Sequence, residues 1–152
     1  MRILWHFIRR KIRRDFPGVP AISTSKLAEL LDENSGSSPM LVDVRKKEEF
    51  DVSHLPNAIH VPNTDALLRL LETENTQDSD KMIVLYCSVG YRSARVTEEL
   101  VAAGVENAVN LDGSIFQWFN EGRSVYRSEK LVGDVHPFSK FWSLLLKRKR
   151  DI

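Results

Sequence analysis

Short apolar runs that alternate with helical patterns are the feature that most constrains the fold of this 152-residue chain. Apolar runs of a few residues are typical of buried strands, and apolar residues spaced three or four apart are typical of amphipathic helices. Their alternation predicts an α/β fold with a mainly parallel central sheet flanked by helices on both faces. We expect strands over 40–44, 58–61, 82–86 and 108–111, and helices over 27–31, 66–71, 93–103 and 115–119.

The most apolar of these strands, 82–86, is expected at the centre of the sheet. Ligands of open α/β sheets bind beyond the carboxyl ends of the strands. Cys87, the single cysteine, follows directly at that end. A thiol between a strand end and a helix N-terminus faces backbone N–H groups and the positive end of the helix dipole, which favour the thiolate.

The residues after Cys87 suit an anion. Gly90 permits a positive φ, Arg92 brings a fixed positive charge, and Ser93 is a favourable N-cap residue for the next helix. The alternative is that Cys87 is an ordinary buried thiol, because free cysteines are often fully buried. A structural thiol has no need of this loop, so the loop favours a reactive cysteine.

The loop Cys87–Ser93 resembles the active-site loop of the rhodanese-like sulfurtransferases. Three other segments resemble signatures of that family in the same order, over about 22–125: Leu41–Arg45 with Glu49 and Phe50, His54–Pro62, and Leu111–Trp118 with Gly122. Two positions depart from the pattern, since Asn57 and Ser114 stand where the family often has glycine.

The resemblance implies that sulfane sulfur is transferred through a persulfide on Cys87, by chemistry that requires no metal or organic cofactor. It implies a small sulfur donor, such as thiosulfate or a persulfide. The acceptor would be cyanide, a thiol or a protein, because the chain has no second cysteine. The residues implied to bind substrate are Ser88, Val89, Gly90, Tyr91 and Arg92, and the supporting residues are Asp43, Arg45 and Ser93.

Three side chains have two readings from the sequence. Asp43 and Arg45 either tie together the loops around the pocket or act directly in catalysis. Arg92 either attracts an anionic donor or forms a structural ion pair with Asp43 or another acid. His54 is expected to hydrogen-bond between loops, and Trp118 to lie in the core.

Two other functions compete with sulfur transfer. Cysteine phosphatases and arsenate reductases have five residues between their cysteine and arginine, whereas four separate Cys87 and Arg92. The shorter loop suits one sulfur atom better than a tetrahedral phosphate. The second competitor is a binding or regulatory module, or a protein persulfide carrier, in which turnover is negligible.

Composition fits one globular domain, with 42% hydrophobic and 28% charged residues. A single cysteine excludes an intramolecular disulfide and favours a reducing compartment such as the cytoplasm. No apolar run approaches the ~18–20 residues that cross a bilayer, and we expect no nucleic-acid partner. The predicted organisation is an amphipathic segment over 1–18, a catalytic domain over 19–127 and a helical extension over 128–152.

Charge gathers at the two ends of the chain. Residues 1–15 and 147–152 together carry ten basic and two acidic side chains, whereas 16–146 carry 12 basic and 19 acidic ones. An apolar stripe predicts a helix over 1–16, and a second helix is expected over 136–146. The first helix could pack on the domain, lie peripherally on an anionic membrane, or serve as a transit peptide. A helix end at Gly36 and a polar loop over 75–80 complete the expectations.

Overall fold

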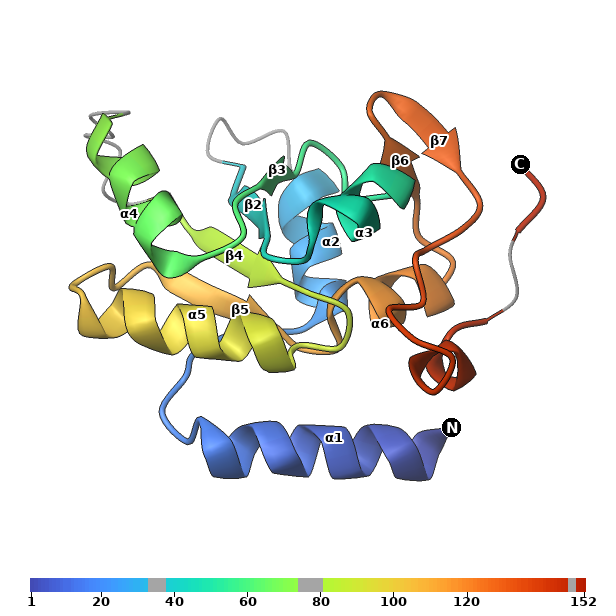
Figure 1. The fold of residues 1–152 in the computed structure, drawn as a ribbon, viewed down its shortest axis with the longest axis horizontal. Helices are drawn as coiled ribbons and strands as arrows, with labels where there is room; N and C mark the ends of the chain where they lie inside the picture. Colours follow the sequence, from blue (N-terminus) through green and yellow to red (C-terminus); the bar gives the residue numbers. More distant parts are fainter. Residues whose placement is uncertain (33–37, 74–80, 148–149) are drawn as a thin grey trace.

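A computed structural model describes residues 1–32, 38–73, 81–147 and 150–152. Its centre is a five-stranded parallel sheet in the order β1-β5-β4-β2-β3 (Figure 1). The strands are β1 (Ala21–Ile22), β2 (Met40–Asp43), β3 (Ile59–His60), β4 (Ile83–Tyr86) and β5 (Ala108–Leu111). The predicted α/β fold and the central position of the cysteine-bearing strand are confirmed. The predicted helix end at Gly36 and the polar loop over 75–80 lie outside the described residues.

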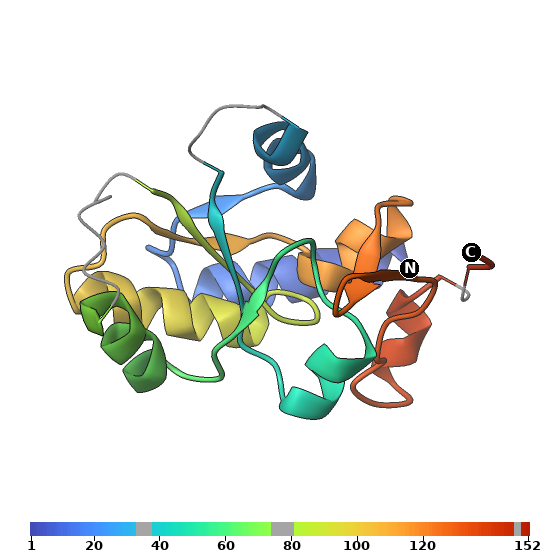
Figure 2. The ribbon, with the colours of Figure 1, turned by 90° about the horizontal axis from the view of Figure 1, so that it is seen from above.

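Helices cover both faces of the sheet, as predicted (Figure 2). One face packs on α4 (Thr64–Thr73) and α5 (Tyr91–Ala102), and the other on α2 (Thr24–Asp32) and α6 (Ser114–Asn120). All four residues of β4 are buried, because side chains that alternate across this strand enter both cores. This burial on both faces explains why the strand reads as a continuous apolar run.

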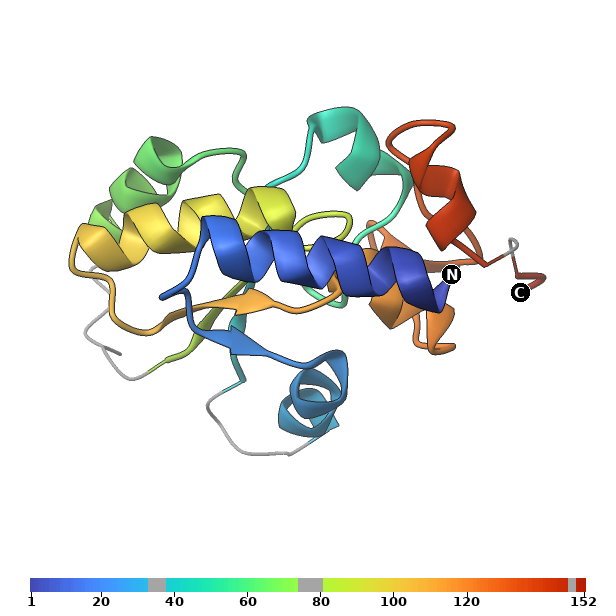
Figure 3. The ribbon, with the colours of Figure 1, turned by 90° about the horizontal axis from the view of Figure 1, so that it is seen from below.

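The first helix, α1 (Arg2–Asp15), runs beside α5 (Figure 3). Its apolar stripe faces inward: Trp5 and Ile8 are buried, and Leu4 and Ile12 pack partly buried against the same core. The packed arrangement among the three alternatives is therefore the one that this structure adopts. A second apolar set is exposed: Ile3 and Phe7 on α1, and Met1 at its N-cap.

The end of the chain differs from the prediction. Residues 136–146 do not form one helix; a single 3₁₀ turn, η1 (Trp142–Leu145), is present. Two features explain the difference: Pro137 disfavours helical backbone at the residue before it, and Phe138 adopts a left-handed φ of 63°. The basic residues Arg148 and Lys149 lie outside the described part of the chain.

A small antiparallel hairpin, β6 (Val125–Arg127) and β7 (Lys130–Val132), was not predicted. It lies beside the short helix α3 (Lys47–Val52), and a bridge between His54 and Tyr126 joins it to the loop after that helix. Across the described residues, no helix is long and apolar enough to cross a membrane.

Candidate active site

Cys87 lies at the carboxyl end of β4, at the start of the loop that leads into α5. Its side chain is buried, and its N–H donates to the Ser114 hydroxyl at 3.1 Å. Gly90 has a φ of 104° and is the N-cap of α5. The positive φ that glycine permits is thus present at this position, and it brings the Gly90 N–H to 3.2 Å from Cys87 Sγ.

Ser93 is not the N-cap that the sequence predicted. The helix α5 begins two residues earlier, at Tyr91, because Gly90 makes the turn into it. Ser93 is consequently the third residue of the helix, and its hydroxyl reaches Cys87 Sγ at 3.5 Å. The side chain therefore supports the thiol rather than the helix end.

Several groups polarise Cys87 towards the thiolate. The Gly90 N–H donates to Sγ at 3.2 Å, and the Ser93 hydroxyl donates from the helix. Burial alone would raise the pKa of Cys87, but the charge of Arg92 and the hydrogen bonds from Ser93 and Gly90 outweigh burial and lower the pKa. The site therefore favours a buried sulfur anion.

Arg92 forms an ion pair, which was one of its two expected roles, and its partner is Glu49 rather than Asp43. The guanidinium makes two hydrogen bonds of 2.9 Å to the carboxylate of Glu49 and one of 2.9 Å to the Ser88 hydroxyl. Ser88 also donates to Glu49 at 3.2 Å. Asp43 is paired elsewhere. This network ties the cysteine loop to the first turn of α3.

Glu49 holds this network in place. Its carboxylate is almost fully buried and accepts the Lys46 N–H at 3.0 Å besides the bonds from the loop. Burial would raise the pKa of Glu49, but the hydrogen bonds from Arg92 and Lys46 outweigh it and lower the pKa. Glu49 is thus an anion that fixes the position of the Arg92 charge.

Asp43 and Arg45 form a second ion pair, which is fully buried. Arg45 Nη2 lies 2.7 Å from Asp43 Oδ2 and donates to the Ser53 carbonyl at 2.6 Å. The pair joins the end of β2 to the loop after α3. No hydrogen bond or ion pair of either side chain to Cys87 occurs among the described residues.

The two remaining expectations concern residues outside the loop. The expected link between loops is present at His54, but it is made by the backbone, which exchanges hydrogen bonds with Tyr126 at 2.8 and 2.9 Å. Trp118 is buried in the core, as predicted.

Sequence reasoning missed three positions that shape the site. Glu49 was noticed only within a signature, and nothing in the sequence pairs it with Arg92. Ser114 adopts a φ of 49°, and its hydroxyl also donates to the Leu111 carbonyl at 3.0 Å. Asn110 donates to the Gly90 carbonyl at 3.0 Å. The departure from glycine at Ser114 was the one available signal.

A cavity of about 220 Å³ opens at Cys87. The cysteine loop forms one side, and α1 and the segment after β7 form the other. Its lining residues are Ile8, Lys11, Cys87, Ser88, Val89, Tyr91, Arg92, Phe138 and Trp142. Four of the five predicted substrate-binding residues therefore border one space with the cysteine, while Gly90 holds the loop behind it.

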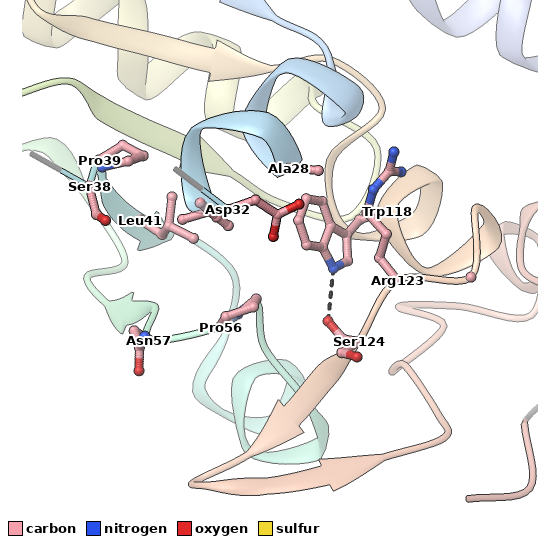
Figure 4. Close-up of a pocket in the computed structure, with 12 residues that line it drawn as sticks. Ala28, Asp32, Ser38, Pro39, Leu41, Pro56, Asn57, Trp118, Arg123 and Ser124 are labelled. Atoms are coloured by element: carbon pink, nitrogen blue, oxygen red, sulfur yellow. Dashed lines mark hydrogen bonds between the residues drawn. The ribbon is translucent and has the colours of Figure 1, made fainter. Parts of the chain in front are cut away.

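A larger cavity, of about 510 Å³, lies between α2, α6 and the loop after α3 (Figure 4). Trp118 borders it and donates from its indole to the Ser124 carbonyl at 2.8 Å. Its lining includes no residue of the loop 87–92. Of these two cavities, the smaller one borders Cys87.

These features define a class: an α/β protein that presents a polarised, buried thiol at the carboxyl end of its central strand. The model of the family described as "Rhodanese-like domain" matches residues 23–121, which is more than half of the chain. This chain belongs to the rhodanese-like domain family.

Known proteins agree with this assignment. The "Adenylyltransferase and sulfurtransferase uba4" of Ogataea parapolymorpha is 39% identical over 83 residues, which are 53% of this chain and 20% of that protein. The "tRNA uridine(34) hydroxylase" of Photorhabdus laumondii is 31% identical over 103 residues, which are 66% of this chain and 29% of that protein. The chain thus spans less than a third of either relative.

A crystal structure offers a comparison over a whole chain. The rhodanese-like domain protein from Staphylococcus aureus has 30% sequence identity and a TM-score of 0.56, and the match covers 78% of this chain and 99% of that one. Together with family membership and the sulfurtransferase name of one relative, this likeness supports a role related to sulfur transfer in general.

Proposed function

We propose that this protein is a sulfurtransferase that carries sulfane sulfur as a persulfide on Cys87. The single observation that carries the proposal is the polarised sulfur: Sγ accepts hydrogen bonds from the Gly90 N–H and the Ser93 hydroxyl and borders a cavity. A thiolate is the form that attacks a sulfur donor, and the same donors can hold the negative charge on the terminal sulfur of a persulfide.

The proposed reaction has two balanced steps. With thiosulfate as donor, the Cys87 thiolate attacks the sulfane sulfur, the sulfur–sulfur bond of the donor breaks, and sulfite leaves with the bonding electron pair. Cyanide, a thiolate or a protein thiolate then attacks the terminal sulfur and releases the Cys87 thiolate. The acceptor must come from outside, since the chain has one cysteine. A reducing compartment such as the cytoplasm would keep that thiol free.

The other proposed roles follow from the contacts. The loop 88–92 surrounds the transferred sulfur, Arg92 lowers the pKa of Cys87, and Ser93 supports the thiolate. Asp43 and Arg45 brace the loop beside the sheet. The proposed catalytic domain is 19–127, with 1–18 and 128–152 as additions to it.

The contact between Glu49 and Arg92 argues against a phosphatase. An arginine that recognises phosphate presents its paired N–H groups to the phosphate oxygens. Here that fork is bound by a buried carboxylate, which would repel a phosphate dianion.

The test is thiocyanate formation from cyanide with a panel of sulfur donors, compared between the wild-type protein and Cys87→Ser. Loss of activity in a folded Cys87→Ser variant is expected. Residual activity above about one per cent would refute Cys87 as the carrier. No thiocyanate and no persulfide from any donor would favour the binding or regulatory module.

A further inference from the structure

The walls of the Cys87 cavity are largely apolar. Beyond the cysteine loop, the space is bordered by Ile8 of α1 and by Phe138 and Trp142 of the segment after β7. Figure 3 shows these two segments of chain next to each other, α1 in blue and the C-terminal segment in red. A ligand that reaches Cys87 therefore contacts hydrocarbon and aromatic surface.

Both cations of this cavity have a carboxylate partner. Arg92 is bound by Glu49 through two hydrogen bonds of 2.9 Å, and Lys11 Nζ lies 2.6 Å from Asp15 Oδ2. Phe138 covers the face of Arg92, with its ring centre 4.6 Å from the guanidinium carbon. A dianion that enters this space loses hydration and gains contact with charges that are already paired, which is unfavourable.

The apolar walls beyond the cysteine loop come from outside the part of the chain that matches the family model. That match covers 23–121, whereas Ile8 precedes it and Phe138 and Trp142 follow it. Asp15 also accepts the Tyr91 hydroxyl at 2.9 Å, which fastens α1 to the cysteine loop. The two ends of the chain thus supply apolar walls to the cavity at Cys87.

We propose that this cavity selects organic sulfur donors with an apolar or aromatic body, such as persulfides or thiosulfonates, over inorganic thiosulfate. The proposal rests on the proposed sulfurtransferase function and specifies its donor class. With a thiosulfonate, the Cys87 thiolate attacks the terminal sulfur, the sulfur–sulfur bond breaks, and a sulfinate leaves with the electron pair. Ile8, Phe138 and Trp142 would contact the body of the donor.

The experiment compares benzenethiosulfonate, methanethiosulfonate and thiosulfate as donors, with cyanide as acceptor. The two thiosulfonates carry the same charge and both release a sulfinate, so they differ mainly in the body that the walls would contact. Phe138→Ala and Trp142→Ala remove parts of the wall. Leu144→Ala is the matched control, because Leu144 is exposed on the same segment and does not line the cavity.

The expected result is a wild-type kcat/KM that is higher for benzenethiosulfonate than for thiosulfate. The ratio of kcat/KM between the benzene and methane compounds should fall about tenfold in Phe138→Ala or Trp142→Ala and stay unchanged in Leu144→Ala. Comparing this ratio between the wild-type protein and each variant cancels the intrinsic difference between the two sulfinate leaving groups. In Phe138→Leu, which keeps an apolar side chain, the same ratio should decrease less. This variant also serves as the test if the alanine variant folds poorly.

Two outcomes would overturn the proposed donor class without overturning the sulfurtransferase function. Efficient sulfur transfer with thiosulfate as the best donor would reject the apolar donor class and leave the sulfurtransferase intact. An unchanged benzene-to-methane ratio in every folded wall variant would do the same. If no donor places sulfur on Cys87, the sulfurtransferase itself fails, and the donor class fails with it.

Discussion

Replacing Glu49 with glutamine should destabilise the protein, because the carboxylate is buried and neutralises Arg92. The two hydrogen bonds from Arg92 join charged groups, and such bonds contribute about 1.5–3 kcal/mol each. Glutamine keeps one acceptor oxygen but turns an NH₂ group towards the guanidinium. Since 32% of the Arg92 side chain is exposed, water recovers part of the loss. We therefore expect a decrease of about 3 kcal/mol in the free energy of unfolding.

Urea denaturation of Glu49→Gln measures this change, and Glu48→Gln is the matched control. Both residues lie in the first turn of α3, so a general effect of the helix dipole would appear in both variants, but only Glu49 is buried. A loss of about 3 kcal/mol corresponds to a decrease in Tm of roughly 6–12 °C for a chain of this size. Equal stabilities of the two variants would refute the structural role of Glu49.

The difference in unfolding free energy between wild type and Glu49→Gln should also depend on pH. The pKa of Glu49 is lowered in the folded protein, so its contribution is complete above the unfolded-state pKa of about 4.3 and is lost as the pH falls through the folded value. The difference between wild type and Glu49→Gln should therefore be largest near neutral pH and shrink in acid. A difference that grows below about pH 4 would contradict this account.

Three further predictions concern the loop and the first helix. Arg92→Ala should raise the pKa of Cys87 and move the pH profile of iodoacetamide alkylation to higher pH. It should also raise KM for anionic donors, because the Glu49 carboxylate loses the charge that neutralises it. An alkylation profile that does not move, or a decrease in kcat with KM unchanged, would contradict this role. One glycine inserted after Val89 should weaken sulfur transfer and allow inhibition by a tetrahedral anion such as vanadate; transfer at the wild-type rate would exclude loop length as the determinant. Deleting residues 1–16 should reduce the unfolding free energy by about 3–5 kcal/mol, since buried side chains of α1 join the core. Full stability after deletion, with salt-sensitive flotation of the intact protein on anionic vesicles, would instead support a membrane role.

The predictable part of the fold was the part set by short-range pattern. Each expected strand appears within a residue or two of its predicted bounds, because buried parallel strands are continuous apolar runs. The failures lie in the short helix α3, in the hairpin β6–β7 and in the segment after it, none of which was predicted correctly. Aromatic residues and leucines at helical spacing predicted a helix in that last segment, but their side chains have different surroundings. Leu145 is buried in the core, Trp142 packs partly against that core and also borders the cavity, and Phe138 borders the cavity. These tertiary contacts, together with Pro137, therefore override the helical spacing of this segment.

The site residues also divide into those that the sequence pattern predicts and those that only the folded chain brings together. Cys87 and Gly90 could be identified because a strand end, a thiol and a flexible residue occur within four positions of the chain. The partner of Arg92 could not, since Glu49 is 43 residues away and is brought near only by the neighbouring positions of β2 and β4 in the sheet. The cavity walls were equally hidden, because they require the two ends of the chain to meet over one loop.

Intact-mass spectrometry of the protein after incubation with a sulfur donor tests the central claim most directly. The account predicts that the wild-type chain gains the mass of one sulfur atom, that cyanide removes it with release of one equivalent of thiocyanate, and that peptide mapping places it on Cys87. The variant Cys87→Ser should gain nothing. A wild-type chain that stays unmodified with thiosulfate, thiosulfonates and organic persulfides alike would contradict the account.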